Sequence, residues 1–463
     1  MKKLNILMVT AAAMFAGIGT SQAEESRTIR LFDEVVFYDG YMSNDKNPDL
    51  DKQDGILRHL TSSYAVRLTD EQMDSFGEEV KMQVFVKACC DNYDRIGNVN
   101  IAFVPKGAET YDQYSVQRIE LGRFITPFMN KNKKPDTVPY SYDINYLSEI
   151  MHDSRMRAEY DYWLEFEIFG VPYAAQQQVA GCAGRTDVFA GTLEFVTSEP
   201  AAENSDNEVL VPIVMKKSED KGGNFNNYRE GCTDEIGKTI KTWTFEVPED
   251  VEDAQIMLVT SNHGANSGGE EYNRRNHIVR FDGDIVLTYK PGRTSCEPFR
   301  QYNTQPNGIY GSTAKSDEAW QSFSNWCPGD VIDNRIISLG AVSKGEHSVK
   351  ISVTRAKFAD QQGDIPVSMF FQGVKKGKLP VAGIDEVTAA REFSSKVTVD
   401  GRTVKVDGGD ELFFVTIYDI SGAQMMEQRG GGEISVAGYT PGVYIVNVEY
   451  TTGLNEAHKI VVR

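Results

Sequence analysis

The chain has 463 residues, with 48 Lys and Arg against 67 Asp and Glu, which gives a formal net charge of −19 at pH 7. This acidic balance argues against nucleic acid or an anionic membrane as a partner, and we attribute it to solubility. The length predicts about three domains of ordinary size.

The first 23 residues have the pattern of a cleavable signal peptide. Lys2 and Lys3 form a positively charged start, residues 6–18 form an apolar run, and Ser21-Gln22-Ala23 is a small-x-small cleavage site. The run is too short to span a bilayer as a helix, and no later segment is long and apolar enough to do so. We therefore expect a secreted protein without a membrane span, cleaved at about Ala23 and acting in the periplasm, at the cell surface or outside the cell.

Six cysteines follow this segment. An even number in an exported protein favours structural disulfides over metal or redox chemistry, and the chain has no C-x-x-C pair. The six are Cys89, Cys90, Cys182, Cys232, Cys296 and Cys327.

Short segments with period-two alternation of apolar and polar residues dominate the chain. Examples are residues 80–86, 98–103 and 278–281, which are separated by clusters of Gly, Asn, Asp and Pro. Long helical periods are scarce. The pattern predicts an all-β protein built from β-sandwiches or jelly rolls.

Two breaks in composition divide the chain. Residues 198–207 are polar and poor in β-branched side chains, and residues 375–380 form a second hinge rich in Lys, Gly and Pro. We expect domains at about 25–198, 207–376 and 384–463.

The last domain has three strand patterns, which begin near Phe414, Gly442 and His458, and it shows no residues that indicate chemistry. Its strings YDISG, GVYIV and KIVV resemble the C-terminal sorting and secretion-tail domains of exported Bacteroidetes proteins. The resemblance implies a small β-sandwich and a dedicated export step to the cell surface or beyond.

The middle of the chain contains carboxylates next to aromatic and basic residues. No nucleophile elbow, HExxH, phosphate loop or EF-hand motif is present, and we interpret His263 and His277 as structural. Three acidic segments remain: 90–95, 163–169 and 268–277. In the second, alternation puts Trp163, Glu165, Glu167 and Phe169 on one face. Carboxylates in such surroundings suit general acid and base work on a sugar-linked bond.

The order of several sequence blocks resembles peptide-N-glycosidase F, a family of bacterial amidases that cut N-linked glycans from asparagine. The blocks are VKMQVFVKACCDNYDRIGNVNIAF from Val80, IELGRFITPF from Ile119, EEYNRRNHIVRF from Glu270 and NWCPGDVIDNR from Asn325. The resemblance covers residues 28–376 and implies two jelly-roll domains. It implies hydrolysis of the asparagine–glycan amide of N-glycoproteins or glycopeptides, without metal or organic cofactor.

Residue by residue, the resemblance implies a site of three carboxylates with flanking binding residues. Asp94 takes the place of the primary catalytic aspartate, Glu271 of the essential glutamate, and Glu167 of the third carboxylate. Glu270 competes with Glu271 for its place, and Glu165 competes with Glu167. Those expected to bind substrate are Arg95, Tyr272, Trp326 and Glu270, although Arg95 has the alternative of a structural ion pair with Asp94.

The chain also departs from the family pattern. The cysteines that flank the essential glutamate are replaced by Gly269 and Asn273, a family arginine is Phe323, and the loop from Glu297 to Ser324 is longer. Because of these losses, a non-catalytic glycan- or protein-binding surface module is an alternative function. A glycosidase that uses the same carboxylates is another. We expect a monomer in each case.

The resemblance implies a disulfide between Cys296 and Cys327. For the remaining cysteines we expect Cys182 to pair with Cys232, and the adjacent Cys89 and Cys90 either to form a vicinal bridge or to pair elsewhere.

Overall fold

The protein is described here from a computed structural model. The described residues are 26–47, 50, 54–199, 201–215, 224–226, 239–264, 270–305, 309–353, 355–356, 363–377, 395–407, 413–420, 424–450 and 455–462. The predicted signal peptide, residues 1–23, lies outside them. The chain divides into two compact units: Met1–Glu219 with Arg293–Gln321 and Trp326–Ile332, and Asp220–Gly292 with Ser322–Asn325 and Asp333–Arg463.

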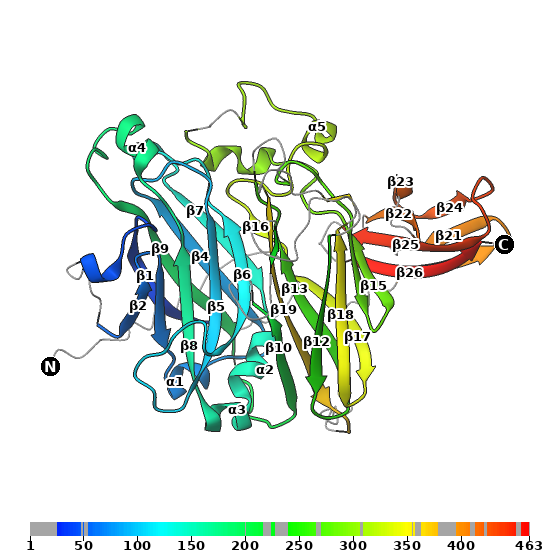
Figure 1. The fold of residues 1–463 in the computed structure, drawn as a ribbon, viewed down its shortest axis with the longest axis horizontal. Coiled ribbons are helices and arrows are strands. Elements are labelled where there is room, and N and C mark those ends of the chain that lie inside the picture. Colours follow the sequence, from blue (N-terminus) through cyan, green and yellow to red (C-terminus); the bar gives the residue numbers. More distant parts are fainter. Residues whose placement is uncertain are drawn as a thin grey trace, which may run out of the picture. The chain divides into compact units, whose positions relative to one another are not determined.

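The first unit contains two facing sheets (Figure 1). One has the strand order β1-β9-β4-β7, and the other β16-β6-β5-β8-β3-β2. Their strands are β1 (Ser26–Tyr38), β2 (Ile56–Leu60), β3 (Ser63–Arg67), β4 (Val80–Ala88), β5 (Ile96–Pro105), β6 (Gln117–Ile125), β7 (Thr137–Asp143), β8 (Tyr160–Ile168), β9 (Asp187–Ser198) and β16 (Val331–Ile332); β10 (Glu208–Val214) also belongs to this unit.

Aromatic side chains fill the space between these two sheets. The Phe37 ring from β1 lies 5.0 Å from the Phe166 ring of β8 and 5.1 Å from the Tyr64 ring of β3, centroid to centroid. Gly191 in β9 allows this packing, because a Cβ there would lie 2.6 Å from the Phe166 ring. Burial of each such ring contributes about 1.5–3 kcal/mol to folding.

Helices are short in the described part of the chain. Thr69 caps α1 with a reciprocal capping box to Gln72, and Asp153 caps α3 through two backbone N–H groups. The helices in the described residues are η1 (Asn44–Lys46), α1 (Asp70–Met73), α2 (Tyr146–His152), α3 (Ser154–Glu159), α4 (Tyr173–Gln178), η2 (Glu297–Tyr302) and α5 (Asp317–Gln321). None of these helices combines the length and the apolar character that crossing a membrane requires.

The second unit contains a further sandwich and a C-terminal module. In the sandwich, β13 pairs with both β19 and β17, and β11 pairs with β19. The opposing sheet has the order β12-β18-β14-β15. The strands are β11 (Asn224–Asn226), β12 (Ile240–Val247), β13 (Val251–Thr260), β14 (His277–Phe281), β15 (Asp284–Tyr289), β17 (Arg335–Val342), β18 (Gly345–Val353) and β19 (Asp364–Lys375).

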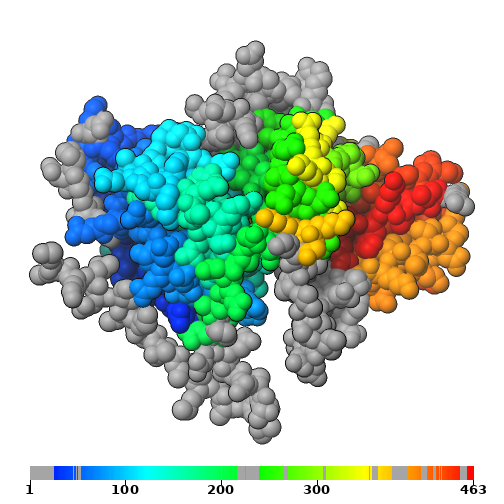
Figure 2. Space-filling view, turned by 90° about the horizontal axis from the view of Figure 1, so that it is seen from below, coloured from blue at the N-terminus to red at the C-terminus, as the bar shows by residue number. Residues whose placement is uncertain are grey.

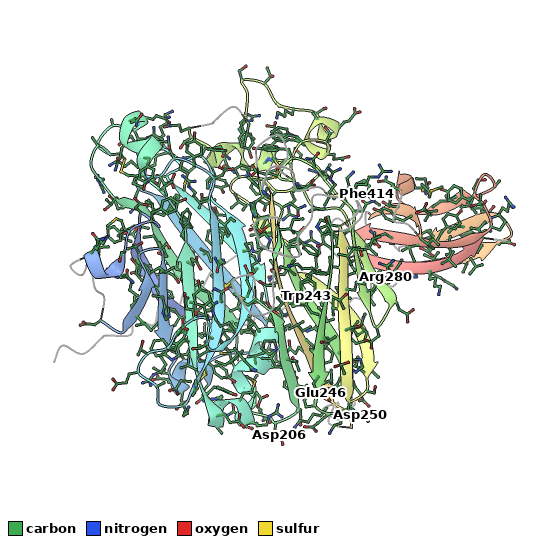
Figure 3. All side chains as sticks on the ribbon, viewed as in Figure 1. Asp206, Trp243, Glu246, Asp250, Arg280 and Phe414 are labelled. Atoms are coloured by element: carbon green, nitrogen blue, oxygen red, sulfur yellow. A yellow bond between two sulfur atoms is a disulfide. The ribbon has the colours of Figure 1, made fainter. Side chains whose placement is uncertain are left out.

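Local chemistry explains the shape of this second sandwich. Strand β12 alternates, so that Trp243 is buried while Glu246 is exposed (Figure 3). Strands β14 and β15 are joined by Asp282-Gly283, whose φ values of 48° and 93° are those of a tight hairpin turn that Gly and Asp favour.

The C-terminal module is a small two-sheet sandwich. Its sheets have the orders β20-β21-β24 and β23-β22-β25-β26. Its described residues form one continuous body, coloured orange to red in Figure 2, around a core that includes Val406, Val415 and Val446. The strands are β20 (Lys396–Asp400), β21 (Thr403–Asp407), β22 (Phe413–Asp419), β23 (Gln424–Arg429), β24 (Gly432–Ser435), β25 (Gly442–Tyr450) and β26 (Asn455–Val462).

The all-β prediction is confirmed, and so are the strands expected from alternation. Residues 80–86 lie in β4, 98–103 in β5 and 278–281 in β14. The predicted domain boundaries stay predictions.

One expected disulfide arrangement is wrong. Cys90 pairs with Cys182, with Cα atoms 5.5 Å apart, so Cys182 does not pair with Cys232 and Cys90 does not form a vicinal bridge with Cys89. The partner is set by tertiary packing, since Cys90 and Cys182 lie in one buried cluster with Ala175 and Val179. Cys232 lies outside the described residues. Cys89 is a free thiol, and the structure has the Cys296–Cys327 disulfide.

Candidate active site

The first candidate group lies in the turn between β4 and β5. Asp94 is half-buried there, and hydrogen bonds hold the residues around it. The buried carboxylate of Asp91 accepts the N–H of Tyr93 at 2.9 Å and the N–H of Val171 at 2.7 Å. The turn that carries Asp94 is thereby tied to the segment that follows β8.

Arg95 strengthens this attachment. Its Nε lies 2.7 Å from Oδ2 of Asp91 and its Nη2 lies 3.3 Å from Oδ1. The ion pair in which Arg95 takes part is therefore with Asp91, four residues earlier. The Arg95 side chain is 21% exposed while that of Asp91 is fully buried, so Arg95 reaches solvent from a fixed position.

Thr126 holds the same turn from the other side. Its hydroxyl accepts the N–H of Arg95 at 2.8 Å and donates to the carbonyl of Tyr93 at 3.1 Å. Its own N–H donates to the carbonyl of Arg95 at 2.8 Å. Both neighbours of Asp94 along the chain are thus anchored to the end of β6.

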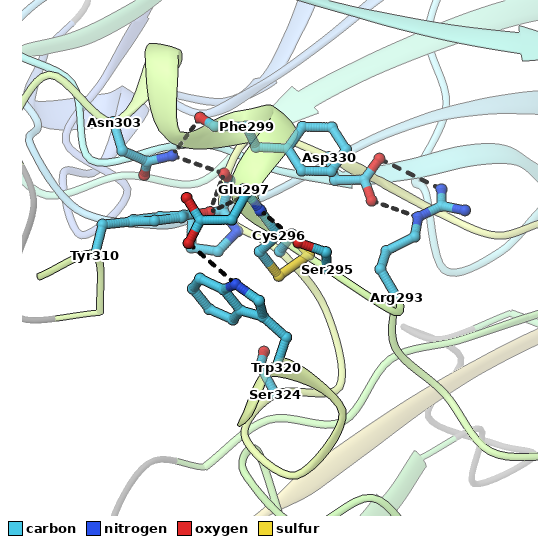
Figure 4. Close-up of a disulfide and its surroundings, with 12 residues drawn as sticks. Arg293, Ser295, Cys296, Glu297, Phe299, Asn303, Tyr310, Trp320, Ser324 and Asp330 are labelled. Atoms are coloured by element: carbon cyan, nitrogen blue, oxygen red, sulfur yellow. Dashed lines mark hydrogen bonds and ion pairs between the residues drawn. A yellow bond between two sulfur atoms is a disulfide. The ribbon is translucent and has the colours of Figure 1, made fainter. Parts of the chain in front are cut away.

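The segment around the Cys296–Cys327 disulfide belongs to the same unit (Figure 4). Glu297 is its centre: the carboxylate accepts hydrogen bonds from Arg300, from the N–H of Lys315 and from Nε1 of Trp320. Chiefly through its bond with Arg300, the pKa of Glu297 falls to about 2. This carboxylate is a structural anchor of the longer loop and carries no proton at neutral pH.

Hydrogen bonds dock this loop next to the Asp94 turn. Asn303 Oδ1 accepts the N–H of Phe128 at 3.0 Å, and the N–H of Gln305 donates to the Phe128 carbonyl at 2.8 Å. Downstream, Asp330 pairs with Arg293 at 2.6 Å, and β16 joins the edge of the sheet beside β6.

Two aromatic residues of this segment, Tyr310 and Trp326, are both buried. Burial raises the pKa of the Tyr310 hydroxyl, and the negative charge of Asp94 contributes to that rise, so the two groups lie within electrostatic reach. Trp326 is only 5% exposed. Little of the Trp326 side chain is therefore open to a sugar in this conformation.

The two competing carboxylates of β8 have different surroundings. Glu165 is fully buried and accepts hydrogen bonds from Arg118, from the Tyr111 hydroxyl at 2.8 Å and from Asn100 at 3.2 Å. Burial alone would raise the pKa of Glu165, but Arg118, Tyr111 and Gln113 lower it. Glu165 is therefore engaged in a structural network.

Glu167 lies two residues further along the same face and is 6% exposed. It stands opposite Asn98 of β5 and Ser63 of β3 in the sheet register. Glu165 is thus committed to Arg118, and Glu167 also lies within electrostatic reach of that guanidinium.

Sequence reasoning missed a second buried ion pair on this sheet and the role of Asp91. Arg123 and Glu120 of β6 form a double hydrogen bond at 2.9 and 2.7 Å, with both side chains fully buried. Two charges three residues apart in a strand with a bulge carry no pairing pattern of their own. Asp91 and Arg95 are only four residues apart in the sequence, and this short spacing is the signal that could have indicated their ion pair.

The second candidate group lies in the second unit, in the turn before β14. Glu271 is 9% exposed. Its Oε2 accepts the N–H of Gly264 at 3.2 Å, and its own N–H donates to the Gly264 carbonyl at 3.3 Å. Burial raises its pKa above the ordinary value, against the hydrogen bonds from Tyr272 and Gly264. A carboxyl group of this kind can keep a proton and give it up.

Glu270, the alternative to Glu271, is committed to an ion pair. Arg275 donates to its carboxylate at 2.8 and 3.3 Å, and Glu270 is 1% exposed. Tyr272 is half-buried, with its ring 5.3 Å from that of Phe323. The arrangement favours Glu271 over Glu270 as the chemically available group.

His277 and His263 have partners of their own. His277 is fully buried, is stacked on Tyr289 and contacts the carbonyl of Arg275, and burial lowers its pKa to about 3. His263 contacts the Ser261 hydroxyl at 2.7 Å. Among the described residues, no three His, Cys, Asp or Glu side chains are grouped so as to hold a metal ion.

Two family models match the chain. Residues 28–183 match "Peptide-N-glycosidase F, N terminal", and residues 232–372 match "Peptide-N-glycosidase F, C terminal". The first range contains Asp94, Arg95 and Glu167, and the second contains Glu271, Tyr272 and Trp326. No curated protein matches the chain.

Solved structures show the same fold. Two structures of PNGF-II are 18% and 19% identical, with TM-scores of 0.52 and 0.51 over 75% of this chain. The chain spans 65% of the length of those proteins. The PNGase F of Flavobacterium meningosepticum, described as a glycosylasparaginase, is 15% identical over 76% of this chain and 96% of its own, with a TM-score of 0.47.

At these identities the solved structures bear on the fold alone, whereas the two family models together match more than half of the chain. The chain belongs to the peptide-N-glycosidase F family.

Proposed function

We propose that the protein is an exported peptide-N-glycosidase that hydrolyses the amide bond between asparagine and an N-linked glycan. The observation that carries the proposal is the Asp94 turn: a half-buried carboxylate, fixed by Asp91 and Thr126, within the part of the chain that matches the family's N-terminal model. N-glycoproteins or glycopeptides are the substrates.

In the proposed reaction Asp94 removes a proton from water, directly or through a second water. The water oxygen attacks the side-chain carbonyl carbon of the glycosylated asparagine. Arg95, fixed by Asp91, donates to the oxyanion that develops on the carbonyl oxygen. The C–N bond then breaks, asparagine becomes aspartate, and the intact glycan leaves as a glycosylamine.

Glu271 is the proposed proton donor to the departing nitrogen. Its burial, which raises its pKa, supports this role. Glu167 is proposed to hold the water or the first sugar, and Tyr272 and Trp326 to contact the sugar. Glu270 has the supporting role of fixing the turn through Arg275.

Export agrees with this substrate, since N-glycoproteins are met outside the cell. The two disulfides of the described residues suit an oxidising compartment. We propose cleavage near Ala23 and a second export step that uses the C-terminal module, whose described residues have a hydrophobic core cluster of their own.

One assay separates the proposed activity from the two alternatives. The protein without residues 1–23 is incubated with a denatured N-glycoprotein, and both products are measured by mass spectrometry. The proposal predicts intact glycan and a gain of about one mass unit at each former glycosylation site, because an amide becomes an acid. Trimmed sugars would indicate a glycosidase instead, and retained glycan binding without release would indicate a binding module.

A further inference from the structure

Residues Phe323–Asn325 contact the Glu271 turn at every position, and we call them the 323–325 strap. The Phe323 ring lies against Tyr272. The carbonyl of Ser324 accepts Nε of Arg274 at 2.5 Å. The turn is thus supported along its length by three consecutive residues that belong to the same unit.

Asn325 makes the most extensive of these contacts. Its Nδ2 donates to the carbonyls of Glu270 at 2.7 Å, Glu271 at 2.6 Å and Asn273 at 3.3 Å. Its backbone N–H also faces the Glu271 carbonyl, at 3.3 Å. Asn325 is 4% exposed, so water cannot readily replace these donors, and buried carbonyls left without a donor are costly.

The same turn is fixed on the opposite side of Glu271. The N–H of Glu271 donates to the Gly264 carbonyl, and the Gly264 N–H donates to the Glu271 carboxylate. Asn325 therefore binds the backbone carbonyl of Glu271, while Gly264 binds the N–H and the carboxylate of the same residue. No cysteine lies in this turn, so its geometry depends on hydrogen bonds and on the Glu270–Arg275 pair.

We propose that Asn325 is a positioning residue that sets the orientation of Glu271 by gathering three carbonyls of the turn onto one amide group. The inference rests on the function proposed above, since it assigns Asn325 an effect on catalysis through Glu271. A merely structural Asn325 would affect stability and leave turnover of the folded enzyme unchanged.

The test compares Asn325→Asp, Glu271→Gln and the double variant with the parent protein. Aspartate keeps the shape of asparagine but places an acceptor oxygen opposite the three carbonyls. We expect kcat to fall about tenfold to hundredfold in N325D, as for a small displacement of a reacting group, with a smaller change in KM. In the E271Q background, N325D should cause no further loss.

Hydrogen–deuterium exchange supplies a readout that does not need activity. Peptides covering residues 270–275 should exchange faster in N325D than in the parent, while peptides from β18 stay protected. Tyr289→Phe is the matched control in the same unit: it removes a buried hydrogen bond to Thr260, and it should lower stability without changing kcat. Asn325→Ser serves if N325D does not fold.

The outcomes distinguish this inference from the proposed function. Unchanged kcat in N325D, or effects of N325D and E271Q that multiply independently, would overturn the positioning role. If the parent protein releases no glycan, the proposed function fails, and exchange alone then decides whether Asn325 holds the turn. Unchanged exchange at residues 270–275 would remove the basis of the inference.

Discussion

The guanidinium of Arg95 is bound by the buried carboxylate of Asp91 through two hydrogen bonds of 2.7 and 3.3 Å. The pair fixes the residue next to Asp94 and uses two of the five N–H donors of an arginine. The remaining donors are those that the proposed oxyanion contact requires. Asp91 is thus central both to the stability of the turn and to the orientation of Arg95.

Replacing Asp91 tests this relationship. Asp91→Ala leaves Arg95 and two backbone N–H groups without their acceptor, and we expect a loss of about 3–5 kcal/mol in the free energy of unfolding, measured by urea denaturation. The control is Asp33→Ala, which removes a 69% exposed partner of Arg30 and should change stability by less than about 1 kcal/mol. Equal effects of the two variants would contradict the structural role of Asp91.

The carboxylates of β8 should respond to substitution in opposite ways. Glu165→Gln breaks the buried pair with Arg118 and should lower stability by about 3 kcal/mol or more. Glu167→Gln should fold with near-parental stability and lose glycan release. The free energy of unfolding and kcat/KM are measured for both variants. A stable but inactive E165Q together with a destabilised E167Q would reverse the structural role given to Glu165 and the functional role given to Glu167.

A non-reducing peptide map tests the cysteine pairing. We expect linked peptides for Cys90 with Cys182 and for Cys296 with Cys327. Cys89 should be alkylated only after unfolding, because burial raises the pKa of its thiol to about 12. Cys182→Ser should cost about 2–5 kcal/mol, as removal of a native disulfide does, whereas Cys89→Ser should be nearly neutral. A linked Cys89–Cys90 peptide would contradict the structure.

The hairpin at Asp282 should make stability depend on pH. His347 Nδ1 lies 2.6 Å from Asp282. Although burial alone would lower the pKa of His347, the hydrogen bond with Asp282 raises it, and in turn His347 lowers the pKa of Asp282. The contribution of charged His347 is complete below its unfolded pKa of about 6.5 and is lost as pH rises through its higher folded pKa.

Asp282→Asn should therefore destabilise the protein more at pH 5.5 than at pH 9, with a difference under about 1 kcal/mol because Asp282 is 42% exposed. Asp284→Asn, on the same hairpin, is the control and should show no such difference. Chemical denaturation at the two pH values measures both. An equal loss of unfolding free energy in D282N at pH 5.5 and at pH 9 would contradict a charge-dependent contribution of the Asp282–His347 pair.

Alternating segments could be predicted from sequence because each strand face is set locally. Residues 80–86 lie in β4, where buried side chains alternate with more exposed ones, whereas Ile278 and Val279 of β14 are both buried. The pairing of Cys90 with Cys182 could not be predicted, because 92 residues separate the two cysteines and only packing brings them together.

The candidate site divides in the same way. Asp94 and Glu271 could be picked out as candidates from sequence blocks. The groups that fix the two turns come from elsewhere in the chain: Thr126 and Val171 hold the Asp94 turn. Gly264 and Asn325 hold the Glu271 turn. Contacts of this kind leave no local pattern. The engagement of Glu165 by Arg118 also depends on strand register.

The most direct test of the central claim is glycan release by the Asp94→Asn variant. The parent protein should release intact glycan from a denatured N-glycoprotein and convert each glycosylated asparagine to aspartate. D94N should retain the parental unfolding free energy within about 1 kcal/mol, because Asp91 and Thr126 still hold the turn, and should release no glycan. Release by a folded D94N variant at the parental rate would contradict the account.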